Sequence, residues 1–160
     1  MSINFANGSE LTTAGSRINA IGHVIQVVEA QHTGRIETTS TSPVSFFTGS
    51  ITLQKATNRV AYYYNSAQRC DVGAGPWNLG YHRLIYTNSG AQLFYSSYNG
   101  FTHNNIIHFA KIGVHEPGSV GPHSYRIDVW AYPGANVQFN SPGNQGNDGV
   151  AVLRLMEIGT

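Results

Sequence analysis

The chain has 160 residues, of which 11% are charged, and its formal net charge at pH 7 is +1. A length of this order suits one domain with its own hydrophobic core, while the charged share is less than half the usual value of about 25%. Basic residues occur singly from Arg17 to Arg154, which argues against nucleic acid as a partner. The surface must be mainly hydroxyl, amide and glycine residues, which favours a shell, fibre or secreted structural protein over a cytosolic enzyme.

The sequence has one cysteine, Cys70, so no disulfide can form within the chain, and no zinc or redox motif is present. We expect it to be a small residue at a strand end, with a bridge between chains as the alternative. The N-terminal residues MSINFANGSE lack the basic and apolar regions of a signal peptide. No run approaches the roughly 18 apolar residues of a membrane span. We therefore expect a soluble protein without membrane insertion, made in the cytoplasm.

Residues 1–22 are polar, rich in Gly, Ser and Asn, and carry only isolated apolar side chains. This composition fits an extended arm that a partner protein would order, or a flexible leader, and it does not fit a helix. The candidate partner contacts of this arm are Ile3, Phe5, Leu11, Arg17, Ile18 and Ile21.

From residue 23 onward, short runs rich in β-branched and aromatic residues alternate with turn residues, without helical spacing or an internal repeat. The pattern predicts about eight to ten strands in an all-β, antiparallel jelly-roll β-sandwich over residues 23–160. The expected strands are 24–30, 44–53, 60–64, 81–86, 92–96, 105–114, 123–131, 137–139 and 149–158, with loops at 70–80 and 140–149.

The last predicted strand, 149–158, is apolar on both of its faces. Side chains alternate along a strand, and a strand that is apolar on both faces must be covered on both sides. One face holds Ala151, Leu153 and Leu155, and the other holds Val150, Val152, Met156 and Ile158.

The first predicted strand, 24–30, is similar, with Ile25 and Val27 on one face and Val24 and Val28 on the other. We infer that the first and last strands are neighbours, with inner faces in the core and outer faces against a partner subunit. A larger monomeric barrel with deeply buried central strands is the alternative. The candidate contacts between subunits are Val24, Val28, Val150, Val152, Leu153, Met156 and Ile158.

Seven histidines raise the question of a metal site. None has the HxH or HExxH spacing that brings two imidazoles to one ion, so we expect no metal and no cofactor. A symmetric trimer could still gather three copies of one histidine on its axis.

The eight acidic residues do not suggest catalysis. Glycoside hydrolysis needs two carboxylates about 5–10 Å apart; Asp128 and Glu157 could be neighbours if their strands pair, but each is more simply a partner for Arg126 or Arg154. No GxSxG motif carries a serine, and the glycine-rich segments read as turns. We expect no catalytic residue, and the chain is not predicted to be an enzyme.

Aromatic residues are frequent in or beside the predicted loops, and Tyr95 is one of them. Exposed rings with Asn and His neighbours are typical of loops that bind sugars or proteins. The alternative is that these rings close the ends of the sandwich. The candidate ligand or receptor contacts are Trp77, Tyr81, Tyr98, Phe101, Trp130 and Tyr132.

Four segments, taken in order, resemble a family of phage and marine-virus virion proteins. They are IGHVIQVVEAQHT, VSFFTGSITLQKATNRV, HSYRIDVWA and VAVLRLMEI. Members of that family carry GxVIQVVQA near the start, a TG-S-ITP segment followed by a KI-V strand, then TYTVQV, and an L-MEI or L-MEV tail. The resemblance covers most of residues 22–158, with divergent middle loops, and depends on the order of the motifs.

The resemblance implies a homotrimer of jelly rolls on the virion surface, similar to the tumour-necrosis-factor and complement globular-head domains. In that fold the first and last strands are neighbours and line the threefold contact. This sequence departs from the family in two places. Leu53 and Gln54 stand where the family has Thr-Pro, which removes a turn signal, and the segment NRVAYYY is more aromatic than the family's aliphatic strand.

The favoured function is a non-enzymatic capsid decoration, or cement, protein of a bacteriophage. Its arm would bind the major capsid protein, and its trimer would match local threefold positions of the shell. We expect the chain to be complete from Met1, without a coiled-coil stalk. The alternative is the receptor-binding tip of a tail fibre or spike, which would hold host-surface glycan with the loop aromatics and need an upstream shaft. A glycan-cleaving virion enzyme is disfavoured by the few acids.

Overall fold

The structure is a computed structural model, and it describes residues 2–4, 10–12, 22–71, 79–99, 106–140 and 149–160. Every regular element in these ranges is a β-strand, and none of them contains a helix of the length and apolarity that would cross a membrane. The strands are β1 Ser2–Asn4, β2 Glu10–Thr12, β3 Val24–Thr33, β4 Ile36–Thr38, β5 Val44–Leu53, β6 Arg59–Asp71, β7 Leu79–Tyr86, β8 Ala91–Asn99, β9 Ile106–His115, β10 Gly121–Ala131, β11 Asn136–Phe139 and β12 Val150–Ile158.

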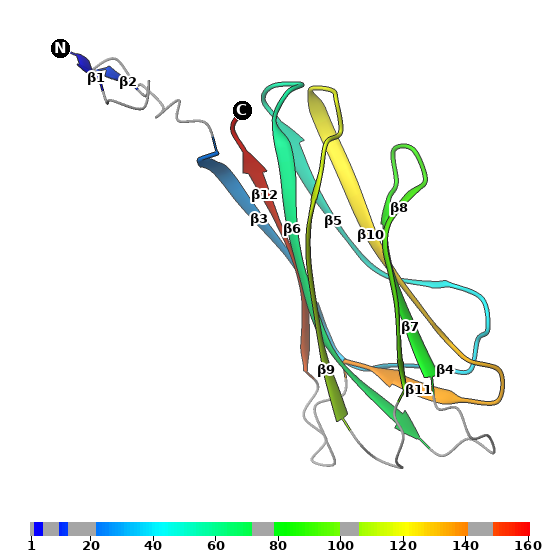
Figure 1. The fold of residues 1–160 in the computed structure, drawn as a ribbon. Coiled ribbons are helices and arrows are strands. Elements are labelled where there is room, and N and C mark those ends of the chain that lie inside the picture. Colours follow the sequence, from blue (N-terminus) through cyan, green and yellow to red (C-terminus); the bar gives the residue numbers. More distant parts are fainter. Residues whose placement is uncertain (1, 5–9, 13–21, 72–78, 100–105, 141–148) are drawn as a thin grey trace.

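Two antiparallel sheets pack face to face as a β-sandwich (Figure 1). The first has the strand order β3-β12-β6-β11-β4, with β9 on the opposite edge of β6, and the second has the order β5-β10-β7-β8. The strands β3 and β12 pair along their whole length, from Val24 opposite Ile158 to Thr33 opposite Val150. The prediction that the first and last strands of the sandwich are neighbours is therefore confirmed.

The core lies between the two sheets and is built from the inward positions of each strand. Leu153 and Leu155 of β12, Tyr64 of β6 and Ile127 and Val129 of β10 are all fully buried. Burial of an aliphatic side chain of this size stabilises a fold by about 1.5–3 kcal/mol. The inward-facing apolar side chains that the alternation predicts thus stabilise the sandwich through their burial.

Several strands extend beyond their predicted limits. The strand β6 reaches Asp71 because it changes partner along its length, pairing with β12 up to Asn65 and with β11 from Gln68. Cys70 is consequently the next-to-last residue of β6, opposite Val137, which confirms its expected place at a strand end, and the loop predicted from residue 70 begins later. The short strand β4, which pairs with β11, was not predicted.

The predicted N-terminal arm is only partly described. The strands β1 and β2 pair with each other, which brings Ile3 opposite Leu11, and Figure 1 shows them beyond the end of the sandwich. Phe5, Arg17 and Ile18 lie outside the described residues, as does Ile21. A partner-binding role of the arm stays a prediction.

Candidate functional site

The outward side of the sheet formed by β3, β12, β6 and β9 is a broad apolar surface, called the outer face here. Residues that are directly opposite on paired strands project to the same side. One such row across the four strands is Val27, Met156, Ala61 and Val114. The apolar residues of the outer face are Val24, Val27, Ala61, Tyr63, Ala110, Ile112, Val114, Val150, Val152, Met156 and Ile158.

The outer face exposes large aliphatic side chains to an unusual degree. The fractional exposures are 50% for Val24, 53% for Val27, 75% for Ile112, 61% for Val114 and 47% for Val150. These are five of the eight large hydrophobic side chains that are exposed in the described ranges. Large aliphatic side chains gathered on the solvent side of one sheet are typical of an interaction surface. Polar side chains share this side, namely Glu29, Gln31, Thr33, Arg59, Asn65, His108 and Arg154.

A β-bulge decides which residues of β3 reach the outer face. Val24 is opposite Ile158, and Gln26 is opposite Glu157, which directly precedes Ile158 in the chain. Ile25 therefore has no opposite residue and is the extra residue of the bulge. The bulge reverses the alternation beyond it, and Val24 and Val27 therefore share the outer face. Strict alternation had placed them on opposite faces.

Two predicted subunit contacts point the other way. Val28 is partly buried and packs against the core cluster, because its partner across the strand pair, Leu155, faces inward. Leu153 is fully buried in the same core. Both residues belong to the interior of the sandwich, so neither can contact a partner through the outer face. The other predicted contacts, Val24, Val150, Val152, Met156 and Ile158, lie on it.

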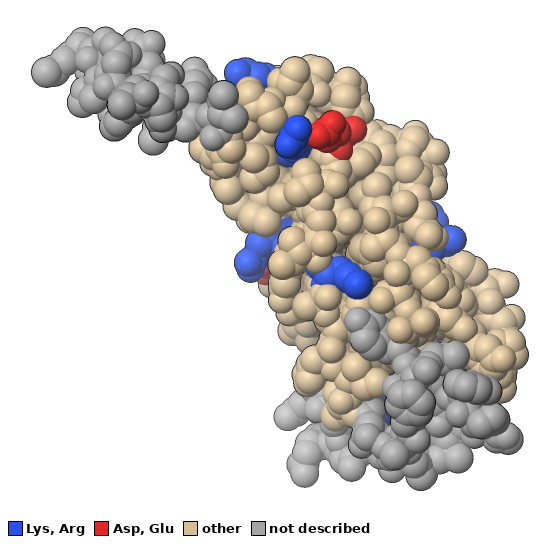
Figure 2. Space-filling model, viewed as in Figure 1, with Lys and Arg blue, Asp and Glu red and all other residues tan. Residues whose placement is uncertain are grey.

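One ion pair lies among the apolar residues of the outer face. Arg154 donates from Nη2 and Nε to Oε2 of Glu29 at 2.6 and 3.0 Å, and Gln31 donates to Oε1 of Glu29 at 2.6 Å. The hydrogen bonds from Gln31 and Arg154 lower the pKa of Glu29 below its ordinary value. Both charges of this pair are thus compensated within the chain. Figure 2 shows few charged groups on the face it presents, and there an acidic group lies against a basic one.

Sequence reasoning missed the contribution of β9 and β6 to this surface. Outward-facing and inward-facing residues alternate along β9. The outward-facing residues include His108, Ala110, Ile112 and Val114, of which three are apolar. That period-two signal is present in the sequence. What it could not indicate is that β9 adjoins β6 on the same sheet as the two terminal strands.

A second group of side chains, the aromatic cluster of Tyr81, Tyr95 and Trp130, lies on the outward side of the other sheet. The rings of Tyr81 and Trp130 stack at 5.1 Å between centroids with an interplanar angle of 16°. The ring centroid of Tyr95 lies 5.8 Å from the ring centroids of Tyr81 and Trp130. Tyr81 and Trp130 were expected near the ends of strands 81–86 and 123–131, beside loops, and the structure pairs them directly across β7 and β10.

Among the remaining predicted loop aromatics, the structure describes the side chain of Tyr132. Tyr132 follows β10 and packs, partly buried, against the core, in agreement with the alternative that some rings close the sandwich. Tyr98 lies in β8 opposite Gly80. Trp77 and Phe101 lie outside the described residues.

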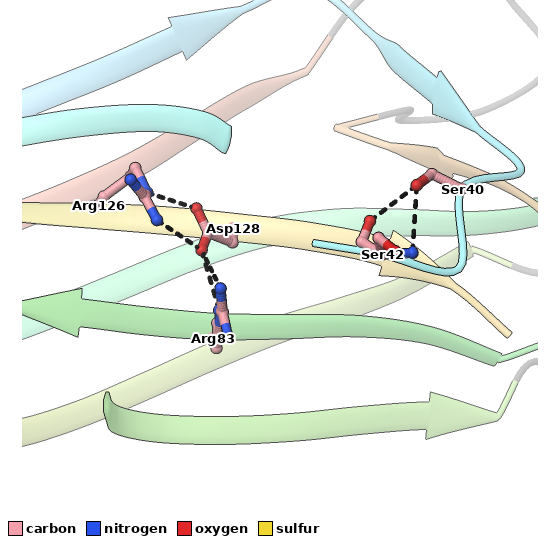
Figure 3. Close-up of polar contacts among 5 residues, drawn as sticks. All are labelled: Ser40, Ser42, Arg83, Arg126 and Asp128. Carbon is pink, nitrogen blue, oxygen red and sulfur yellow. Dashed lines mark hydrogen bonds and ion pairs between the residues drawn. The ribbon is translucent and has the colours of Figure 1, made fainter. Parts of the chain in front are cut away.

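Beside the aromatic cluster, Asp128 is held between two arginines (Figure 3). Arg83 donates from Nε and Nη2 to Oδ2 of Asp128 at 2.9 and 2.8 Å, and Arg126 donates from Nε to Oδ1 at 2.6 Å and from Nη2 to Oδ2 at 3.1 Å. The hydrogen bonds to Asp128 raise the pKa of Arg126. The guanidinium carbon of Arg83 also lies 5.6 Å from the centre of the Trp130 ring, within cation–π range.

Asp128 and Glu157, the two acids considered as a carboxylate pair, are not strand neighbours. Asp128 lies in β10 of one sheet and Glu157 in β12 of the other. Asp128 pairs with Arg126 as expected, but Arg154 pairs with Glu29 instead of Glu157. The buried Glu157 accepts hydrogen bonds from the Gln54 backbone and from the Asn58 and Gln26 side chains at 2.6–2.8 Å.

The buried histidines form hydrogen bonds within the sandwich. His82 bonds the Tyr64 hydroxyl through Nδ1 at 2.9 Å and Gln68 Oε1 through Nε2 at 3.0 Å, and burial lowers the pKa of His82 to about 3. His123 bonds the Tyr86 hydroxyl and the Ser119 carbonyl. Across the described ranges, no three His, Cys, Asp or Glu residues are grouped so that they could hold a metal ion.

No protein-family profile and no curated protein sequence matches the chain. Among solved structures, it is similar to a chain of infectious bursal disease virus, Gt strain, with 12% identity and a TM-score of 0.44, and to a chain of T=1 particles derived from infectious bursal virus, with 9% identity and a TM-score of 0.43. The alignments cover 94% of this chain but only 42% and 40% of those chains, so it spans less than half their length. Similarity at this level transfers no function from those proteins to this chain.

Proposed function

We propose that the protein is a non-enzymatic structural component of a bacteriophage virion surface that assembles as a homotrimer through its outer face. The observation that carries this proposal is the apolar surface of β3, β12, β6 and β9, in which Ile112 is 75% exposed in the isolated chain. Covering such side chains gains about 1.5–3 kcal/mol each when burial is complete. A second and third copy of the same chain would provide that cover.

The strand order supports a jelly-roll topology for the sandwich. The chain crosses between the sheets from β3 to β5, from β5 to β6, and from β6 to the hairpin of β7 and β8, then returns through β9, β10 and β12. This alternation places β3-β12-β6-β9 against β5-β10-β7-β8, as two wrapped Greek keys would. The trimeric virion proteins that the sequence resembles use the sheet with the first and last strands for their threefold contact.

The charges of the outer face are consistent with a symmetric contact. Glu29 and Arg154 neutralise each other within one chain, so copies could approach without an unpaired buried charge. Arg59 and Glu116 form a second such pair, at 2.9 Å, at the end of β6 and beyond the end of β9. Most soluble oligomers of identical subunits have closed symmetry, and a threefold assembly is one such form.

Capsid decoration is the role that we favour for this trimer. Residues 1–22 would bind the major capsid protein, and three arms from one trimer would bind with high avidity at a local threefold position of the shell. The trimer would be made in the host cytoplasm and added to the head. No catalytic group, metal or cofactor takes part in this function.

The test combines the mass of the oligomer with binding to phage heads. Light scattering on the full chain should give the mass of three copies, and removal of residues 1–21 should keep that mass while abolishing attachment to heads. A stable monomer at the concentrations used for attachment would contradict the trimer. Full attachment after the deletion would contradict binding through the arm.

The receptor-binding tip of a tail fibre or spike is the second candidate function, and one observation favours it. Three aromatic rings and two arginines gather on the outward side of the sheet β5-β10-β7-β8. Tyrosine, tryptophan and arginine are the residues that dominate binding energy in recognition sites. Antibody labelling of intact virions would separate the two roles, because decoration predicts label over the head and receptor binding predicts label at fibre or spike tips.

A further inference from the structure

We propose that the aromatic cluster, together with Arg83 and Arg126, binds an acidic glycan, meaning an oligosaccharide that carries carboxylate sugars. The inference rests on the second proposed function and deepens it by naming residues and a ligand class. It does not depend on the trimer, because the aromatic cluster lies on the sheet that does not carry the outer face.

The first argument is the pairing of apolar rings with polar neighbours. Tyr95 is 50% exposed, and it lies against the stacked pair of Tyr81 and Trp130. A sugar ring has apolar C–H faces and hydroxyl groups around its edge, so it suits an aromatic surface bordered by hydrogen-bonding groups. Neighbouring positions on the paired strands supply such groups in Ser45, Thr48 and Ser97.

The second argument is the charge of the sheet. The strands β5, β7, β8 and β10 contain two arginines, Arg83 and Arg126, one acid, Asp128, and no other Asp, Glu, Lys or Arg, which leaves a net charge of +1 (2 − 1). The carboxylate of Asp128 is 1% exposed, so it is shielded from a ligand on this face. An anionic group is therefore attracted rather than repelled.

The third argument is the fixed orientation of the guanidinium groups. Asp128 engages Nε and Nη2 of both arginines, so the ion pairs hold these side chains in place without using Nη1. The side chains of Arg83 and Arg126 remain 26% and 39% exposed. A planar, pre-oriented guanidinium is well suited to bind a carboxylate.

A nucleic acid is a poorer match for the same surface. Each nucleotide adds a phosphate charge, and binding relies on several lysines or arginines along the backbone. The four strands offer a net charge of only +1. An oligosaccharide with an occasional carboxylate fits that balance better.

Isothermal titration calorimetry on the full chain tests the proposal, with a galacturonic acid hexamer as the acidic probe and a glucose hexamer as the neutral one. The acidic hexamer should bind more tightly than the neutral one, and added salt should weaken it. Tyr95→Ala should reduce affinity for the acidic hexamer at least about tenfold, while Tyr95→Phe should retain it. Val120→Ala is the matched control, because Val120 is 62% exposed and precedes β10 rather than lying on the sheet.

Arg126→Gln isolates the charge. Asp128 keeps Arg83 as its partner in this variant, so the fold should persist, and the preference for the acidic hexamer should disappear. Equal affinity for the two hexamers in the unaltered chain would overturn the acidic class, and unchanged binding by Tyr95→Ala would overturn the site. Tighter binding of oligothymidylate than of the acidic hexamer would identify a nucleic-acid site instead. Antibody labelling of intact virions tests the receptor-binding role separately, so label at fibre or spike tips together with equal affinity for the two hexamers would overturn the acidic glycan and leave the receptor-binding role standing.

Discussion

Ile112 of β9 lies directly opposite Tyr63 of β6, and Tyr63 lies opposite Arg154 of β12, so one row of side chains crosses three strands of the outer face. The isoleucine is 75% exposed, although it occupies the middle of a paired strand. Replacing such an exposed aliphatic side chain by a polar one should change the free energy of unfolding of the isolated chain little. Its importance would appear only when another copy covers it.

We predict that Ile112→Asp dissociates the trimer and leaves the sandwich folded. The aspartate would be an unpaired charge inside the contact, which costs about 3–5 kcal/mol. Light scattering should report the mass of one chain, while circular dichroism stays that of a β-protein. The control is Val120→Asp, since Val120 is exposed to a similar degree but lies outside the strands. If Ile112→Asp remained a trimer, this face would not be the contact.

Substitutions at two adjacent residues of β12 should separate the core from the contact. Val152 is on the outer face and Leu153 is fully buried in the core. We expect Val152→Asp to give a folded chain that no longer assembles, and Leu153→Ala to keep the assembly while lowering the free energy of unfolding by about 2–5 kcal/mol. Leu153→Asp should not fold. Chemical denaturation and mass measurement of the three variants check this; a folded Leu153→Asp monomer would be incompatible with the buried position.

The sequence predicts the sandwich and the pairing of its terminal strands because both depend on alternation along single strands. The predicted faces of Val27 and Val28 are wrong because a bulge at Ile25 reverses that alternation. No residue type at this position indicates a bulge. The gathering of Tyr81, Tyr95 and Trp130 depends on the register among β7, β8 and β10. Register between strands far apart in the chain is a tertiary property, so single-strand patterns located these rings without bringing them together.

Acid should destabilise the fold through His82. Burial lowers the pKa of this side chain from 6.5 to about 3, so the unfolded chain binds a proton that the folded chain does not. Stability is therefore complete above pH 6.5 and is lost as the pH falls toward about 3, with a slope of up to about 1.4 kcal/mol per pH unit. Burial also lowers the pKa of His115, which adds to the loss in the same direction.

The measurement is the free energy of unfolding as a function of pH, compared between the unaltered chain and His82→Gln. Glutamine retains hydrogen-bonding groups near Tyr64 and Gln68 but does not titrate in this range. The variant should be less stable at pH 7 and should show a shallower loss of stability below pH 6.5. Parallel curves for the two proteins would mean that the pKa of His82 is the same in the folded and the unfolded chain.

Asn140 should be a critical residue where three strands end near one another. Its backbone has a φ of 61°, in the left-handed region, and its side chain is 1% exposed. The Nδ2 atom lies 3.0, 2.9 and 2.5 Å from the carbonyl oxygens of His32, Gly34 and Gly149, so its two hydrogens are shared among three acceptors. Asparagine supplies both requirements, since it tolerates the left-handed conformation and carries an amide donor.

Two substitutions at Asn140 separate these requirements. Asn140→Gly keeps the left-handed conformation but leaves partly buried carbonyl groups without their donor, which costs about 1–3 kcal/mol. Asn140→Ala loses the same donor and adds about 1–2 kcal/mol for the left-handed backbone. Chemical denaturation should therefore rank the unaltered chain above Asn140→Gly, and Asn140→Ala last. Equal stability of the two variants would show that the backbone relaxes out of the left-handed region, and equal stability of all three would show that the amide does not hold the strand ends together.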